Sequence, residues 1–391
     1  MEALFSGIGS VVPFILLIGV VVTVHEFGHY LAGRFFGAGV ESFAFGFGDS
    51  IVETTDGRGT RWRLNWLPLG GFVKFVDEMQ SPGDSQKSES NVVGKPYSEL
   101  AAWQRVIVSL AGPMINFVFA ILIYAVLSMT LGEAVYERVG ISRVMEDSPA
   151  ATAGLKPDDV IVEIANRPVK TPEDVMLPVQ YSAEEALLFR VLRNGEYLDI
   201  TVTPRRTINR NEALDIEEEV GQIGIQFERP TGIERADPIT ALASGAEKTV
   251  NLIRATIKVL TRLVTGKDSI EKMRGPLGIG DFADKLVDSH MKQVDVPLAY
   301  RLRGALISMA AMAALFSVSI GFFNLLPIPM LDGYHAILGL YETIVGSQVS
   351  MRVQEYLLRG GLAVIGLFFI AVTWNDLKRT GVLEVFARML S

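Results

Sequence analysis

Two histidines and a glutamate stand together near the start of the chain, in the run Val24-His25-Glu26-Phe27-Gly28-His29. In a helix, residues four positions apart lie one turn apart on the same face, so both imidazoles can reach one metal ion. Glu26 lies beside them, where its carboxylate can polarise a water molecule on that metal. The run therefore predicts a zinc site of the H-E-x-x-H kind, with His25 and His29 as ligands and Glu26 as general base.

The helix that carries these residues is otherwise apolar, running from about Gly7 to Val24 and continuing to Phe36. Ionisable groups are costly in hydrocarbon, so they normally face the interior of a helix bundle and serve a function. A zinc ion would give both imidazoles a partner there. The alternative is a helix end at the membrane interface, where the three side chains are simply hydrated.

A catalytic zinc ion usually has three protein ligands and one open position. No further ligand follows the motif at a suitable spacing, so the third must come from elsewhere in the chain. In the run from Asn324 to His335, Pro327 and Pro329 end a helix just before Asp332. Asp332 is the predicted third ligand, and its alternative role is the N-cap of the next helix. His335 either orients Asp332 or is a polar surface residue.

The composition indicates a membrane protein: 49% of the 391 residues are hydrophobic and only 20% are charged. Cysteine is absent, which excludes disulfides and thiolate metal sites. The net charge is −8 with no basic block, so nucleic acid is not an expected partner. A spanning helix needs roughly 20 apolar residues. Four stretches approach or exceed that length: Gly7–Val24, Val106–Leu131, Ala305–Leu331 and Gly360–Trp374.

Two of these stretches have alternatives. The first could be a cleaved signal peptide. Against this, the residues before the apolar stretch include the acidic Glu2 and no basic residue. The fourth could be a buried helix of a soluble domain. We expect four transmembrane helices, and hence a polytopic α-helical membrane protein.

The segments outside the spans differ in character. Residues 37–75 alternate as strands do and are rich in aromatic residues, which predicts a sheet at the membrane interface. The composition of residues 77–96 predicts a flexible loop, and residues 134–228 are expected to form an inserted α+β module. Residues 238–264 form a basic amphipathic helix, which lies either on the membrane surface or against the protein itself.

The sequence resembles the intramembrane site-2 zinc metalloproteases, of the bacterial RseP (regulator of sigma-E protease) type. The run His25–His29 resembles the first motif of that family, and Asn324–Gly333 its second, N-x-x-P-x-x-x-L-D-G. Three further runs support the alignment: Pro68–Lys74, Ala111–Asn116 and Gly275–Ile279. The resemblance covers nearly the whole chain.

This resemblance implies roles for individual residues. Zn2+ would be held by His25, His29 and Asp332, and Glu26 would be the general base. The substrate backbone, unwound from its helix, would be bound by Asn324. It would also pair with the strand residues Phe45, Gly46, Phe47 and Gly48.

Residues 148–161, Ser-Pro-Ala-Ala-Thr-Ala-Gly-Leu-Lys-Pro-Asp-Asp-Val-Ile, resemble part of a PDZ domain. Gly224 and Ile225 would then form an edge strand to which the C-terminus of a peptide adds by β-augmentation. The alternative is a module without a ligand, acting as a steric plug. Many relatives carry two PDZ domains in tandem, whereas this chain has one.

Together these observations predict seven segments. They are the first transmembrane helix (1–36), the membrane-associated strands and loop (37–103), the second transmembrane helix (104–131), the PDZ domain (132–230), the amphipathic helix and connector (231–302), the third transmembrane helix (303–335), and the fourth with the C-terminal tail (336–391).

The function implied by the resemblance is zinc-dependent cleavage of peptide bonds inside the transmembrane segments of single-pass membrane proteins, such as anti-sigma factors already trimmed by another protease. The expected location is the bacterial inner membrane, with the active site toward the cytoplasm and the PDZ domain outside. The expected partners are these substrates, the lipid bilayer and a peptide C-terminus at the PDZ domain. The alternatives are a membrane-anchored PDZ adaptor with a vestigial metal site, and a metal transporter.

Overall fold

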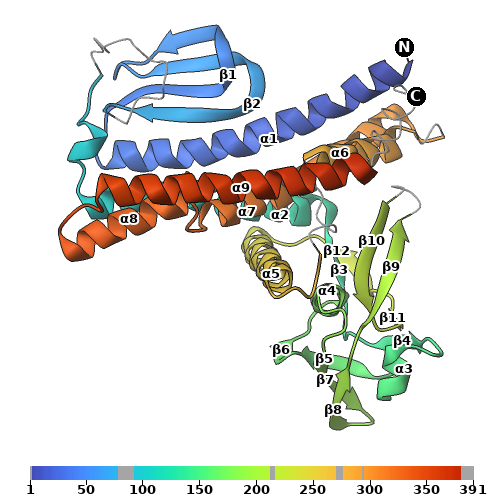
Figure 1. Cartoon of the computed structure of the whole chain (residues 1–391). Helices are drawn as coiled ribbons and strands as arrows, with labels where there is room; N and C mark the ends of the chain where they lie inside the picture. Colours follow the sequence, from blue (N-terminus) through green and yellow to red (C-terminus); the bar gives the residue numbers. More distant parts are fainter. Residues whose placement is uncertain (1, 78–91, 212–215, 270–275, 293–294, 380–391) are drawn as a thin grey trace, which may run out of the picture. The chain divides into compact units, whose positions relative to one another are not determined.

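The computed structural model describes residues 2–77, 92–211, 216–269, 276–292 and 295–379 (Figure 1). The chain divides into two compact units, one made of Met1–Tyr124 and Met273–Ser391 and the other of Ala125–Lys272. Most of the loop expected at residues 77–96, Gly275 of the run Gly275–Ile279 and the end of the C-terminal tail lie outside the described residues.

The first unit is a helical bundle with a small sheet. Among the described residues, four helical segments are long and apolar enough to cross a membrane: Ile15–Phe35, Ala102–Leu131, Leu298–Asn324 and Met351–Leu377. They lie in α1 (Glu2–Phe35), α2 (Ala102–Leu131), α7 (Leu298–Asn324) and α9 (Met351–Arg379). The prediction of four spanning helices is thus confirmed by length and composition. The shorter α6 (Pro276–Met291) and α8 (Asp332–Val345) complete the unit, with a short 3-10 turn at Tyr97–Glu99.

The third span ends inside the segment 303–335, because α7 stops at Asn324, before the two prolines predicted to break it. Residues 325–331 form a tight turn in which the backbone N–H of Leu331 donates to the carbonyl of Ile328 over 3.0 Å. Pro327 and Pro329 explain the break, since proline lacks an N–H and restricts the residue before it. The next helix, α8, has Leu331 as its N-cap and Asp332 as its first residue, so Asp332 does not cap it.

The sheet is built from two long strands, β1 (Val40–Thr55) and β2 (Arg61–Phe75), and lies along α1 (Figure 1). Residues 42–45 pair with residues 71–74 on one side and with residues 61–64 on the other, while residues 50–55 pair with residues 61–65. The strands therefore fold back into four segments, in the order 71–75, 40–47, 61–65 and 50–55. Gly46, Gly48 and Gly70 have positive φ angles of 85°, 87° and 105°, which allow the bends.

The second unit is rich in strands and surrounds a core that includes the fully buried Phe189 and Val191. Its main sheet has the order β6-β5-β7-β8, with β5 at Val160–Ile164, β6 at Arg167–Pro168, β7 at Leu187–Arg193 and β8 at Glu196–Val202. Asn194 and Gly195 form the turn of the β7–β8 hairpin with φ angles of 53° and 87°, as a type I′ turn requires.

Shorter elements complete this unit. The helix α3 (Pro149–Ala153) is capped by the Ser148 side chain and ends at Gly154, whose φ angle is 89°. Three two-stranded sheets pair β3 with β12, β4 with β11 and β9 with β10. The remaining bounds are β3 Glu133–Val135, β4 Ile141–Val144, α4 Pro172–Gln180, β9 Arg205–Asn211, β10 Ile216–Gln222, β11 Ile225–Phe227, β12 Gly232–Glu234 and α5 Pro238–Val264.

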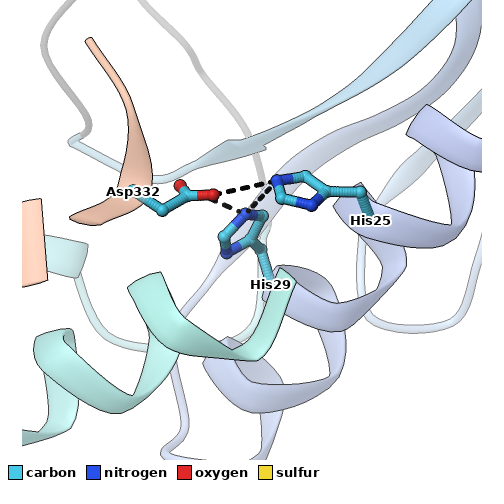
Figure 2. Close-up of side chains that lie close together, drawn as sticks. All are labelled: His25, His29 and Asp332. Carbon is cyan, nitrogen blue, oxygen red and sulfur yellow. Dashed lines mark hydrogen bonds and ion pairs between the residues drawn. The ribbon is translucent and has the colours of Figure 1, made fainter. Parts of the chain in front are cut away.

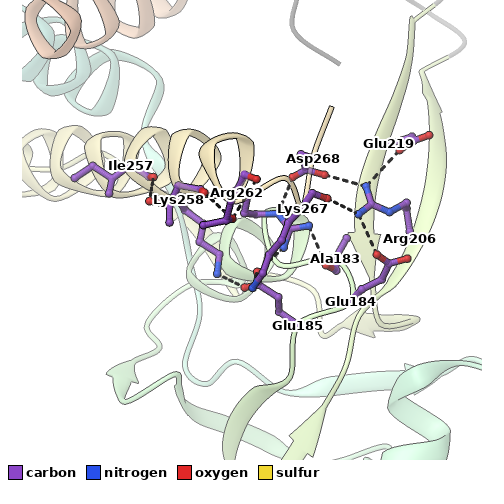
Figure 3. A network of polar contacts seen from close by, with 12 residues as sticks. Ala183, Glu184, Glu185, Arg206, Glu219, Ile257, Lys258, Arg262, Lys267 and Asp268 are labelled. Carbon is purple, nitrogen blue, oxygen red and sulfur yellow. Dashed lines mark hydrogen bonds and ion pairs between the residues drawn. The ribbon is translucent and has the colours of Figure 1, made fainter. Parts of the chain in front are cut away.

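The amphipathic helix α5 packs against its own module through its basic side chains. Arg262 is buried and contacts the carboxylates of Glu185 and Asp268 at 2.8 and 2.6 Å, and Lys258 also pairs with Glu185 (Figure 3). Burial by itself would raise the pKa of Glu185, but hydrogen bonds from Lys258 and Lys267 outweigh it and lower that pKa to about 2. These cations therefore serve internal ion pairs. The apolar positions Ile239, Leu242, Val250, Ile257 and Val264 are exposed.

Candidate metal centre

Three side chains from two distant parts of the sequence meet in the first unit. His25 and His29 project from one face of α1, and both are buried. Their Nε2 atoms lie 3.1 Å apart. Asp332, at the start of α8, brings one carboxylate oxygen to 2.9 Å from His25 Nε2 and the other to 3.4 Å from His29 Nε2 (Figure 2).

These atoms are spaced as zinc ligands would be. Zinc bonds of about 2.0–2.2 Å at tetrahedral angles separate two ligand atoms by roughly 3.3–3.5 Å. The two Nε2 atoms lie 3.1 Å apart, and their distances of 2.9 and 3.4 Å to Asp332 end on its two different oxygens. Two imidazole nitrogens and a carboxylate oxygen are ligands that zinc accepts. The oxygen of Asp332 nearest His25 is buried and, apart from that contact with His25 Nε2, has no hydrogen-bond partner among the described residues. The side chains therefore fit a zinc ion with three protein ligands.

Two glycines let α1 and α2 approach closely enough to build the site. A methyl group on Gly28 would lie 2.7 Å from Cγ2 of Ile115, and one on Gly112 would lie 2.6 Å from Cε1 of His29. Carbon atoms in contact normally stand about 3.5–4.0 Å apart. Any larger side chain at either position would therefore push the two helices or the imidazole rings apart.

The second ring nitrogens of the two histidines face α2. His29 Nδ1 lies 2.8 Å from the backbone carbonyl oxygen of Val108. His25 Nδ1 lies 3.3 Å from the side-chain amide of Asn116, which is fully buried. Sequence reasoning missed both contacts, because the run Ala111–Asn116 served only to support the family resemblance. An asparagine inside an otherwise apolar spanning helix is the feature of the sequence that could have indicated the contact with His25.

The predicted base, Glu26, is not one of the three converging side chains. Its Oε2 atom accepts a hydrogen bond from the backbone N–H of Val73 in β2 over 3.1 Å. The carboxylate is thereby held between α1 and the sheet, one residue from His25. Sequence reasoning did not foresee that β2 would supply this donor.

Asn324, the last residue of α7, also reaches the centre. Its Nδ2 atom lies 3.4 Å from His25 Nε2. The structure thus brings five predicted site residues to one place, namely His25, Glu26, His29, Asn324 and Asp332. Their roles as ligands, base and substrate-binding residue stay predictions.

The predicted pairing of substrate with Phe45–Gly48 stays a prediction, and the structure shows which strands already flank Phe45. This residue pairs with Gly71 on one side and with Leu64 on the other, so it lies inside the sheet. The carbonyl of Gly46 already accepts a hydrogen bond from Asn65 Nδ2 over 2.9 Å. The reason is the fold-back of β1 and β2, which strand alternation alone does not reveal.

Both predicted roles of His335 stay predictions. Its side chain is exposed, and its ring lies edge-on to that of Tyr334 with centroids 5.5 Å apart. Within the described parts of the chain it makes no hydrogen bond to Asp332.

Gly224 and Ile225 lie in the second unit. Ile225 begins β11, which pairs antiparallel with β4 through Ile225 and Val144. Among the described strands β4 is the only neighbour of β11, so its other edge has no strand partner. Gly224 has a φ angle of 77°, and its carbonyl accepts a hydrogen bond from the N–H of Met145.

Comparison of the chain with known proteins shows the family to which it is similar. A family model described as peptidase family M50 matches residues 13–368. A protein of Mesorhizobium japonicum named as a zinc metalloprotease is 35% identical over 95% of this chain and 99% of its own length. Metalloprotease MmpA of Caulobacter vibrioides is 33% identical over 95% of this chain and 96% of its own length. A zinc metalloprotease of Agrobacterium fabrum is 34% identical, with coverage of 95% and 96%.

Proposed function

The chain belongs to peptidase family M50 and is a zinc metalloprotease with several membrane spans, and from this premise we propose that it cleaves peptide bonds within the membrane. Its substrates would be the transmembrane segments of single-pass membrane proteins. The observation that carries this proposal is the meeting of His25, His29 and Asp332 beside Glu26, at helices long enough to span a bilayer.

The residues around the centre supply the chemistry. When bound, the zinc ion supplies Lewis acidity toward the scissile carbonyl and the attacking water. Glu26 accepts the proton of that water and delivers it to the leaving amine. The hydrogen bond from the N–H of Val73 holds the Glu26 carboxylate in position before the reaction.

A transmembrane helix hides its amides in internal hydrogen bonds and must unwind before it can be cleaved. The backbone N–H of Val76, just after β2, donates to the carbonyl of Gly39, just before β1, whereas that of Val73 donates to Glu26. Alternation along the strand then directs the N–H of Gly71 to the same side as that of Val73. We place the unwound substrate beside Gly71–Val73, with the Asn324 amide available for a further hydrogen bond. We therefore propose that the substrate backbone pairs with the edge at Gly71–Val73 and not with Phe45.

The second unit is proposed to be a single PDZ domain on the extracytoplasmic side of a bacterial inner membrane, with the metal centre toward the cytoplasm. One edge of β11 pairs with none of the described strands, which supports binding of a peptide C-terminus by strand addition. The competing role is that of a steric filter, which would exclude substrates that still carry a bulky outer domain. In either role the protein would act in signalling of the RseP type, on pre-trimmed anti-sigma-factor-like substrates.

The lipid bilayer is the other proposed partner of the second unit. The exposed side chains of Ile239, Leu242, Val250, Ile257 and Val264 recur at helical spacing along α5. Because the basic side chains of Lys258 and Arg262 are engaged in internal pairs, apolar burial and not attraction to lipid phosphates would hold α5 on a membrane.

The experiment that tests the function is cleavage of a model single-pass substrate, lacking its outer domain, in proteoliposomes. Wild type, Glu26→Gln and a chelator-treated sample with and without added zinc would run in parallel, and bound zinc would be measured in each. We expect cleavage within the span by wild type, a fall of about 10²–10⁴-fold in Glu26→Gln, and equal zinc in both. Zinc without cleavage of a varied substrate panel would instead favour an adaptor or a transporter.

A further inference from the structure

We propose that Asn116 is a positioning residue of the metal centre, which accepts a hydrogen bond from His25 Nδ1–H and thereby directs the lone pair of His25 Nε2 to the zinc ion. Asn116 lies on α2, opposite the motif helix α1. The inference rests on the zinc site and does not depend on which protein is the substrate.

The two imidazoles are arranged in the same way. Both Nε2 atoms face Asp332, and both Nδ1 atoms face α2. A neutral imidazole that binds metal through Nε2 carries its proton on Nδ1, and that N–H needs an acceptor. For His29 the acceptor is the carbonyl oxygen of Val108, at 2.8 Å. For His25 the atoms within reach belong to the side-chain amide of Asn116.

The orientation of this amide decides which of its atoms faces His25. The oxygen and nitrogen of an asparagine side chain are nearly interchangeable by a half-turn, and hydrogen-bond partners assign them. With Nδ2 facing His25, the buried Oδ1 atom has no partner among the described residues. If His25 Nδ1 carries a proton, two donors would also face each other. A half-turn places Oδ1 on His25 Nδ1–H and removes the clash of donors, and Nδ2 then takes the position without a partner among the described residues.

Asn116 is held where it can serve this role. Its side chain is fully buried, so water cannot take over as acceptor. The hydroxyl of Ser317 on α7 donates to its backbone carbonyl over 2.8 Å. Val108, Gly112 and Asn116 are each four residues apart and therefore lie on one face of α2. This face supplies an acceptor for each imidazole, with the close-contact glycine between them.

The test compares two substitutions of nearly equal size in the full-length protein. Asn116→Asp keeps an acceptor oxygen but removes the amide nitrogen, whereas Asn116→Leu removes both polar atoms. Zinc affinity would be measured by competition with a chelator in detergent, with cleavage of the model substrate as a second readout. We expect Asn116→Asp to stay within about threefold of wild type and Asn116→Leu to bind zinc about 10- to 100-fold more weakly.

The matched control is Ser319→Ala, which removes a hydroxyl on α7 that donates to the carbonyl of Leu315 and not to Asn116, and it should leave zinc affinity unchanged. Asn116→Ala serves as a second variant if Asn116→Leu does not fold, as judged by the melting temperature of the metal-free protein. Wild-type zinc affinity in folded Asn116→Leu or Asn116→Ala would overturn the inference, as would loss of zinc in Asn116→Asp equal to that in Asn116→Leu. Zinc binding without cleavage by wild type would remove only the proposed function.

Discussion

Gly112 of α2 faces His29 of α1 so closely that a methyl group on Gly112 would lie 2.6 Å from Cε1 of the imidazole. The same methyl group would lie 2.9 Å from Cε1 of His25. One hydrogen atom in place of a side chain thus sets the distance between the two helices at the metal centre. This relationship explains why α2, which supplies no ligand, shapes the zinc site.

We therefore expect Gly112→Ala to displace both rings and to lower zinc affinity and cleavage together, by about 100-fold, since a shift near 1 Å at a reacting centre has effects of that size. Gly366→Ala is the control, because a methyl group at Gly366 in the spanning helix α9 meets no atom within 4 Å. Zinc content by mass spectrometry checks the result. Normal zinc binding in Gly112→Ala would show that the two imidazole rings can move aside without losing zinc, contrary to this prediction.

Asp332 and His335 provide a paired test of the third ligand. Asp332→Ala removes an oxygen that lies 2.9 Å from His25 Nε2, so the purified protein should lose its zinc. His335→Ala, three residues further along α8, removes an exposed ring and should retain zinc and activity. Both proteins would be assayed for metal and cleavage in the same detergent. Loss of zinc in His335→Ala would contradict this expectation and indicate that His335 orients Asp332.

The turn before Asp332 is braced by α9. A side chain on Gly361 would meet the ring of Pro329, with Cβ 2.6 Å from Cγ, whereas one on Gly360 would meet nothing within 4 Å. Gly361→Leu should therefore shift the turn at residues 325–331 and weaken zinc binding, while Gly360→Leu should not. The measurement is the zinc affinity of the Gly361→Leu and Gly360→Leu variants, compared under the same conditions. Equal affinities would mean that α9 does not position Asp332.

Glu185 predicts a pH dependence for the docking of α5. Its pKa is lowered from 4.5 to about 2 by hydrogen bonds from Lys258 and Lys267, which outweigh the opposing effect of burial. A lowered pKa stabilises the folded state above the unfolded value, so this contribution is present above pH 4.5 and is lost as the pH falls toward 2. Hydrogen exchange of α5 in the full-length protein should therefore accelerate across that interval.

The matched variants separate Glu185 from surface charge in general. Glu185→Gln should accelerate exchange in α5 already at about pH 7, because it removes the partner of both lysines. Glu247→Gln removes only the exposed pair with Lys170 and should leave exchange unchanged, since such pairs contribute little. Equal rates in Glu185→Gln and wild type would mean that other contacts hold α5.

The sequence by itself determined the features that depend on local periodicity. Four-residue spacing placed His25 and His29 on one helical face, continuous apolar runs indicated the spanning helices, and Pro327 with Pro329 marked where the third helix stops. These inferences need only the geometry of a single helix. The choice of Asp332 as the third ligand relied on its place after that break, and the structure brings it to the two imidazoles.

Tertiary structure alone decided which atoms surround those residues. The acceptor for His29 is a backbone carbonyl of Val108, and the donor to Glu26 is a backbone N–H of Val73, so neither is encoded by residue type. Phe45 lies inside the sheet because β1 and β2 fold back on themselves at glycines. Contacts of this kind depend on how close two elements far apart in the chain can come. Packing sets that distance, and local sequence patterns do not report it.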